Sequence, residues 1–174
     1  MRGMELLNPG IDGRQAYDIA QVAHDGQNDL QGYAYIFHPL HVAGVSSERL
    51  RAIGSHLSEF GYVLGMLHDT VEDSPLTIED LVERGATPMF ARCMVLISRN
   101  AGQVYDEYTD GLINADLPAD VHLALLVTKD ADVEHNMDPT RPCKGFESRN
   151  KRYSKTRAKL AVRIQELMEE VKGA

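Results

Sequence analysis

Apolar residues recur at helical spacing along nearly the whole of this chain, and that pattern restricts the fold more than any other feature of the sequence. The clearest case is a stripe near the C-terminus, at the i, i+4, i+7 and i+11 positions of one helix face: Leu160, Ile164, Leu167 and Val171. No segment alternates between apolar and polar residues for long enough to require a β-strand. The sequence therefore predicts an all-α fold, and its 174 residues fit one helical domain over 1–174.

Local signals place the ends of the expected helices. Apolar spacing, N-caps and prolines predict helices over 14–23, 39–45, 57–67, 77–85, 88–98, 105–113, 118–138 and about 151–171. Thr77, with Asp80 three residues on, is the expected capping box of one helix, and Thr87 is the expected N-cap of the next. Residues 140–149 are expected to form a loop.

Composition narrows the choice of partner and compartment. The net charge is −8, Trp is absent and only 6% of residues are aromatic, which argues against a nucleic-acid polymer as partner. No apolar run approaches the roughly 18 residues of a membrane span, and the N-terminus has no signal-peptide pattern. Two cysteines are too few for a disulfide framework; Cys93 is expected in the core and Cys143 near the surface. We expect a reduced, cytoplasmic protein without membrane contact.

The strongest local feature is the pair His68-Asp69, at the end of an apolar helix and followed by Glu72 and Asp73. His68 and Glu72 are i, i+4 neighbours, as are Asp69 and Asp73, so all four groups crowd one helix end. Three neighbouring acids repel one another unless a cation or a proton lies among them. Imidazole and carboxylate ligands suit Mn, Fe, Co, Ni or Zn better than a metal that prefers thiolates.

A second polar cluster lies on the long helix that precedes Pro139. Lys129, Asp132 and Asn136 share one face of it, and the apolar run before them indicates that the helix is buried. A buried carboxylate is costly unless it is paired or bound to a metal, so Asp132 is a natural further ligand. His38 starts its own helix; such a histidine is more often structural, but here it belongs to an ordered set with the other two clusters.

This ordered set carries a resemblance to a known family. The chain contains AHDGQ (23–27) with YAYIFHPLHVA (33–43), then LHDTVEDS (67–74), then KDADVEHNMD (129–138). With these segments it resembles the HD-domain phosphohydrolases and, among them, the RelA/SpoT-type domain that degrades (p)ppGpp. The resemblance covers about residues 20–140, and LHDTVED is its most specific part.

The resemblance implies a set of site residues and a cofactor. The implied cofactor is one divalent ion, Mn²⁺ in most of the family, with Fe, Co, Ni, Zn or Mg as alternatives. Glu72 and Asp73 match the acids that position and activate the attacking water, and Asn136 matches a residue near the nucleotide. The implied metal ligands are His38, His68, Asp69 and Asp132.

One loop departs from the family pattern. Where the (p)ppGpp hydrolases carry basic residues, this chain has Asn28, Asp29, Leu30 and Gln31, which should weaken its grip on a highly charged nucleotide. Arg99 and Lys129 are expected to supply positive charge at the site instead. Tyr105 can stack on a base or fill the core, and core packing is the commoner role.

Three functions therefore stay open. The first is a stand-alone (p)ppGpp 3′-pyrophosphohydrolase, because the chain ends at Ala174 with no synthetase segment. The second is another HD enzyme, a nucleotidase or a dNTP triphosphohydrolase. The third is a silent HD module that binds a nucleotide or a protein. The apolar stripe of the C-terminal helix fits packing on the core or on a second copy of the chain, so a homo-oligomer is also open.

Overall fold

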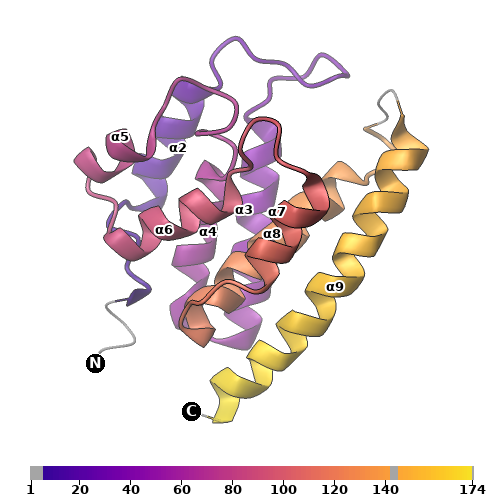
Figure 1. Ribbon diagram of the computed structural model, residues 1–174. Coiled ribbons are helices and arrows are strands. Elements are labelled where there is room, and N and C mark those ends of the chain that lie inside the picture. The colour runs from indigo at the N-terminus through magenta and orange to yellow at the C-terminus, as the bar shows by residue number, and fades with distance from the viewer. Residues whose placement is uncertain (1–5, 142–144, 174) are drawn as a thin grey trace.

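The computed structural model describes residues 6–141 and 145–173, and within them it is built from helices without a β-strand (Figure 1). The all-α prediction is thereby confirmed. The helices are α2 (Gly13–Ala23), α3 (Phe37–Ile53), the short 3₁₀ helix η1 (Ser55–Leu57), α4 (Ser58–Leu67), α5 (Ile78–Glu83), α6 (Pro88–Ile97), α7 (Tyr105–Ile113), α8 (Ala119–Asn136) and α9 (Phe146–Gly173).

Helices α3, α4 and α8 form the centre of the bundle, and the other helices surround them (Figure 1). Helix α4 is buried along almost its whole length, from Phe60 to Leu67, and α8 is buried from Val121 to Thr128. A helix that is apolar on all sides has to be enclosed by other elements, which explains why these two lie inside. Both helices carry predicted site residues at their C-terminal ends, so the core itself holds the site in place.

A glycine sets the distance between α3 and α4. A Cβ at Gly65 would lie 2.8 Å from both the Cα and the backbone nitrogen of Ala43. Only glycine permits two helix backbones to approach this closely. The approach matters for the site because His38 lies on α3 and His68 directly follows α4.

Helix α9 packs lengthwise along α8 (Figure 1). Leu160 and Leu167 of the predicted stripe are buried, which shows that the stripe packs on the core of the same chain. Arg157 adds a polar fastening, because its guanidinium donates to Asp130 and to Glu134 on α8. The same two acids accept hydrogen bonds from Arg49 of α3, so one ionic network joins three helices.

Two predicted helix ends were wrong. Helix α3 does not stop near Val45 but runs to Ile53, because Ser46, Ser47 and Leu50 continue its buried face. Helix α9 starts at Phe146, within the span predicted as a loop, and not near residue 151. Gly145, with φ of 76°, supplies the turn before it, and its carbonyl accepts from the Arg149 amide, which begins the helical hydrogen bonding.

The remaining expectations concern the cysteines and the membrane. Cys93 is buried in the core with a free thiol, as predicted. Cys143 lies outside the described residues. In the described part of the chain, no helix combines the length and the apolar character that crossing a bilayer requires.

Candidate metal centre and nucleotide site

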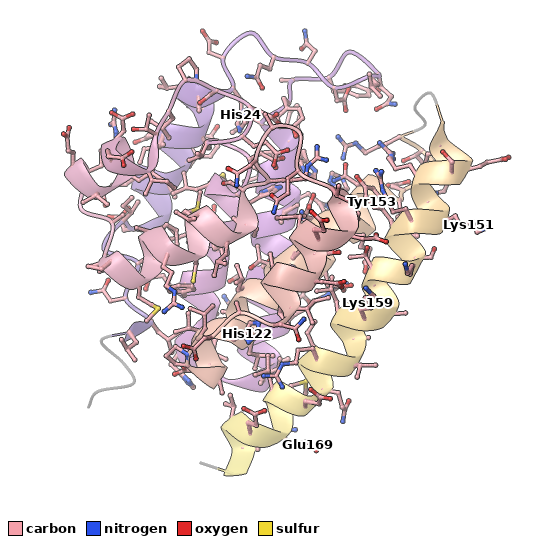
Figure 2. The ribbon with its side chains drawn as sticks, viewed as in Figure 1. His24, His122, Lys151, Tyr153, Lys159 and Glu169 are labelled. Carbon is pink, nitrogen blue, oxygen red and sulfur yellow. The ribbon has the colours of Figure 1, made fainter. Side chains whose placement is uncertain are left out.

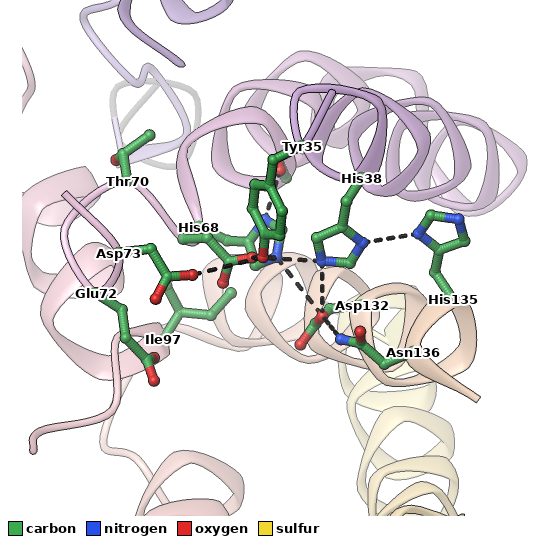
Figure 3. A network of polar contacts seen from close by, with 12 residues as sticks. Tyr35, His38, His68, Thr70, Glu72, Asp73, Ile97, Asp132, His135 and Asn136 are labelled. Atoms are coloured by element: carbon green, nitrogen blue, oxygen red, sulfur yellow. Dashed lines mark hydrogen bonds and ion pairs between the residues drawn. The ribbon is translucent and has the colours of Figure 1, made fainter. Parts of the chain in front are cut away.

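The four implied metal ligands come from three helices and meet at one point (Figure 3). His38 lies in the first turn of α3, His68 and Asp69 follow α4, and Asp132 lies near the end of α8. Nε2 of His38 lies 3.3 Å from Oδ2 of Asp69 and 3.3 Å from Oδ1 of Asp132. Nε2 of His68 lies 3.0 Å and 3.6 Å from the same two oxygens.

This geometry fits a metal ion. Both Nε2 atoms are buried, yet neither makes a hydrogen bond, although carboxylate oxygens surround them. Ligands about 2.0–2.2 Å from one ion lie roughly 3 Å or a little more from their neighbours, which is the spacing found here. Candidate ligand atoms of His38, His68 and Asp69 all lie within 4.8 Å of one another, and Asp132 borders this trio through the two histidines.

The electrostatics of the cluster favour a positive charge at its centre. Burial on its own would lower the pKa of His68, but the carboxylates of Asp69 and Asp132 outweigh burial and raise that pKa to about 10. Burial on its own would raise the pKa of Asp69 and of Asp132. The neighbouring cationic groups outweigh burial and hold both pKa values well below the ordinary value. A bound proton balances the negative charge of these carboxylates, and so does a divalent cation.

Each of the four candidate ligands makes a further hydrogen bond, that of His38 being the contact of its Nδ1 with Nδ1 of His135. Nδ1 of His68 lies 2.7 Å from the carbonyl oxygen of Gly65, which leaves Nε2 free to face the cluster. The hydroxyl of Tyr35 donates to Oδ2 of Asp69 at 2.7 Å. Asp132 accepts hydrogen bonds from the side chains of Lys129 and Asn136. Such supporting contacts fix the direction of a ligand's lone pair and are a regular feature of metal sites.

Lys129 and Asn136, which were predicted to contact the substrate, both bind Asp132. Nζ of Lys129 donates to Oδ2 at 2.8 Å, and Nδ2 of Asn136 donates to Oδ1 at 2.6 Å. Lys129 also lies 5.1 Å from the ring centre of Tyr108, a cation–π contact. Both residues therefore orient a candidate ligand as well as lining the cavity described below.

The predicted catalytic acids lie on the turn after His68-Asp69, on the opposite side of the cluster from His135 (Figure 3). Oε2 of Glu72 accepts a hydrogen bond of 3.0 Å from the backbone amide of Arg99, which holds the side chain in place. Burial and the neighbouring charges of Asp69 and Glu72 raise the pKa of Asp73, which makes it a stronger base. Gln27 supports this turn, because its Nε2 donates to the carbonyl of Asp73 at 2.8 Å.

Glu72 and Asp73 open onto a cavity of about 170 Å³, together with the carboxylate ligands Asp69 and Asp132. Arg99, Lys129 and Arg152 bring positive charge to its wall, and Tyr105 and Tyr153 bring aromatic rings. The guanidinium of Arg152 lies 4.4 Å from the ring centre of Tyr105, so this ring contacts a cation as well as the core. Tyr153 lies on the side of α9 that faces α7, whereas Lys151 points outward (Figure 2).

A second cavity of about 270 Å³ adjoins the first and shares Tyr35 and Asn136 with it. The loop that departs from the family pattern, residues 28–31, lines this cavity. Asp29 pairs there with Arg141 at 3.6 Å, and Arg149 of α9 completes the wall. Cations from outside the loop thus lie where the loop itself supplies none.

The structure adds site residues that the sequence did not single out. They are Tyr35, His135, Arg141 and Tyr153. His135 is not among the metal ligands that the sequence motifs imply, but its ring contacts His38 directly. Arg149 and Arg152 belong to a late basic run for which the sequence favours solvated surface and keeps a phosphate-facing role as the less common alternative; the direction of α9 brings both to the cavities.

No protein-family model matches the chain. Over 70 residues it is 40% identical to a GTP pyrophosphokinase of Myxococcus xanthus, a match covering 40% of this chain and 8% of that protein. Over 68 residues it is 38% identical to the bifunctional (p)ppGpp synthase/hydrolase SpoT of Escherichia coli K12, covering 39% of this chain and 9% of SpoT. The chain thus resembles RelA/SpoT-type proteins, and each match spans about a tenth or less of the relative's length.

A solved structure shares the fold over nearly the whole chain. The similarity has a TM-score of 0.63 and 19% sequence identity, and it covers 94% of this chain and 97% of the other. That protein is described as a metazoan ortholog of SpoT that hydrolyses ppGpp. The chain therefore has the helical fold of that hydrolase, including the part contributed by α9.

Proposed function

We propose that this chain is a metal-dependent phosphohydrolase of the HD type, and that it releases pyrophosphate from the 3′ position of (p)ppGpp. The observation that carries the proposal is the convergence of two imidazole nitrogens and two carboxylates beside a cavity that also holds acids and cations. Similarity to the (p)ppGpp synthase/hydrolase SpoT supports the choice of nucleotide.

The proposed cofactor is one divalent ion, held by His38, His68, Asp69 and Asp132. Such an ion, when bound, polarises a phosphoryl oxygen and lowers the pKa of water. Two nitrogen and two oxygen donors suit Mn²⁺, and they also suit Fe, Co, Ni or Zn, whereas Mg²⁺ prefers oxygen donors alone. We propose Mn²⁺, and we expect the ion that is bound to depend on the concentrations of these metals around the protein.

The chain's own residues would perform the proton transfers and balance the charge. Asp73 or Glu72 takes a proton from the attacking water, which then adds to the phosphorus next to the 3′ oxygen. The bond from that phosphorus to the 3′ oxygen breaks, pyrophosphate leaves, and the proton held by Asp73 or Glu72 passes to the 3′ oxygen, which becomes the ribose hydroxyl group. Arg99 and Arg152 line the cavity and would stabilise the negative charge that accumulates on the phosphoryl oxygens.

One observation keeps a second enzyme function in view. Asp29 lies in the wall of the second cavity, where a carboxylate repels a phosphate group, although its pairing with Arg141 reduces that repulsion. A nucleotide with fewer phosphates, as a nucleotidase or dNTP triphosphohydrolase would use, tolerates this acid better. The (p)ppGpp proposal therefore relies on Arg141 and Arg149 to bind the distal phosphates.

The test is release of pyrophosphate or phosphate from a panel of nucleotides that includes ppGpp, with Mn²⁺ present. Glu72→Gln removes a proton acceptor while keeping shape, and should lower kcat for the preferred substrate by about 10²–10⁴-fold. Glu79→Gln is the matched control, because Glu79 is exposed on α5 and does not line the cavity.

The outcomes separate the three functions. Pyrophosphate release from ppGpp that is lost in Glu72→Gln supports the proposal. Turnover of other nucleotides alone would replace the substrate and keep the mechanism. Absence of turnover across the panel, with Mn²⁺ bound, would point to a binding module.

A further inference from the structure

Three histidine rings lie in contact beside the candidate metal centre. His38 and His41 belong to α3, and His135 lies in the last turn of α8. The rings of His38 and His135 are nearly parallel, at 9°, with centres 5.0 Å apart, and His135 stacks on His41 at 3.9 Å and 16°. Nδ1 of His38 lies 2.7 Å from Nδ1 of His135, so these two rings meet edge to edge in nearly one plane (Figure 3).

The direction of His38 determines which of its nitrogens must carry a proton. Its Nε2 faces the carboxylates of the candidate metal centre, so a metal would bind there. A neutral imidazole that donates its Nε2 lone pair carries its proton on Nδ1, and that N–H needs an acceptor. His68 has such an acceptor in the carbonyl of Gly65.

For His38 the choice of acceptor is narrow. Among the described residues, Nδ1 of His38 is bonded to Nδ1 of His135 at 2.7 Å and lies 3.3 Å from Nη1 of Arg141. A guanidinium has no acceptor, so Arg141 cannot take this proton. Nη1 of Arg141 lies 2.9 Å from Nδ1 of His135 as well, and can only donate to it.

We infer that His135 is a positioning residue whose unprotonated Nδ1 accepts the Nδ1–H of His38 and thereby aims the Nε2 lone pair of His38 at the metal. The inference rests on the proposed metal site. His135 then carries its own proton on Nε2, and Arg141 reinforces this tautomer because it donates to the same Nδ1. Residues that orient a metal-binding histidine in this way typically contribute about 10–100-fold to metal affinity.

The experiment measures Mn²⁺ binding to the metal-stripped protein by isothermal titration calorimetry. His135→Phe keeps a stacking ring but removes the acceptor, and should weaken Mn²⁺ binding by about 10–100-fold. His135→Asn places an amide oxygen near the former Nδ1, and should recover much of the loss. His41→Phe is the control, because His41 stacks on His135 without bonding to a candidate ligand, and should bind like the parent.

A second measurement needs no variant. In the Zn²⁺-loaded parent protein, ¹⁵N chemical shifts of the imidazole rings report which nitrogen carries the proton. We expect Nδ1–H for His38 and Nε2–H for His135. The opposite tautomer for His135 would overturn the inference even if His135→Phe failed to fold.

The results also separate this inference from the proposed function. Tight Mn²⁺ binding by the parent together with equal binding by His135→Phe would refute the positioning role alone. A parent that binds neither Mn²⁺ nor Zn²⁺ would refute the metal site and the inference with it. A loss in His135→Phe that His135→Asn reverses, with both variants folded, supports the role assigned to His135.

Discussion

Gly65→Ala is the substitution that best tests how the helix packing holds the candidate metal centre. The new methyl carbon would lie 2.8 Å from the Cα and nitrogen of Ala43, about 0.7 Å closer than carbon atoms pack. Because the obstacle is helix backbone and not a flexible side chain, α3 and α4 have to move apart. Overpacking of this kind costs about 3 kcal/mol at its upper range, and the better helix propensity of Ala returns about 1 kcal/mol.

The net loss should therefore be about 2 kcal/mol, or a fall in Tm of about 4–8 °C for a chain of this size. The metal centre should suffer as well. Nδ1 of His68 is bonded to the carbonyl of Gly65, so His68 would follow α4 away from His38 on α3. A metal site tolerates an error of about 0.2 Å in the distance to a ligand. The overlap of about 0.7 Å at Ala43 exceeds this tolerance, so the separation of α3 and α4 should weaken Mn²⁺ binding by about tenfold or more.

Differential scanning calorimetry and titration with Mn²⁺ measure the two effects. Gly61→Ala is the matched control, because its methyl group would meet Cδ1 of Leu50 at 2.2 Å, the end of a side chain that can rotate. It should lower Tm less and leave Mn²⁺ affinity unchanged. A Gly65→Ala protein with the parent's Tm and Mn²⁺ affinity would refute the coupling between the α3–α4 approach and the metal centre.

Three further predictions concern stability. Mn²⁺ at about 100 times its Kd should stabilise the fold by about 2.7 kcal/mol and raise Tm by about 5–10 °C, an effect that His68→Ala or a chelator abolishes. Burial lowers the pKa of His122 below its ordinary 6.5, so as the pH falls the unfolded chain binds a proton before the folded chain does. The free energy of unfolding should therefore fall by up to about 1.4 kcal/mol per pH unit below about pH 6.5. Urea titrations of His122→Gln should show a shallower fall. Arg157→Ala removes the ion pair between α9 and Asp130, and should lower the free energy of unfolding, measured by urea titration, by about 1 kcal/mol. Arg163→Ala breaks ion pairs only within α9, and should change that free energy by less than about 0.5 kcal/mol.

The sequence predicted those parts of the fold that local chemistry decides. Thr77 and Asp80 form the expected capping box, and Thr87 caps α6, because a side-chain oxygen within three residues of a free amide is a local signal. Helix α7 has the predicted bounds, Tyr105–Ile113. The error at the end of α3 arose because its buried face continues to Leu50, beyond the predicted end, and the error at α9 arose because the turn at Gly145 starts the helix inside a segment interpreted as loop.

The site residues likewise fall into those that the local sequence indicates and those that only the packing of the helices brings together. The segment containing His68 and Asp69 stands out because a histidine and three acids at the end of an apolar helix need a cation or a proton among them, and the structure brings the pair together with His38 and Asp132. The contact between His38 and His135 spans 97 positions, and no periodicity encodes it. It depends on how α3 and α8 cross, which only the packed structure determines.

The charge of the cavity indicates an order of binding. Asp69, Asp132, Glu72 and Asp73 line it together with three cations of the described chain, so its formal charge is −1. Without a metal, a proton on His68, whose pKa is raised to about 10, offsets this charge, so the site attracts an anionic nucleotide only weakly, in keeping with the net charge of −8 on the whole chain. A divalent cation would change the charge of the cavity to +1, and only then would Arg99, Lys129 and Arg152 act as part of an attractive surface. In the proposed enzyme the metal therefore has a role before the chemistry: it converts an acidic pocket on an acidic protein into one that can admit a phosphate group.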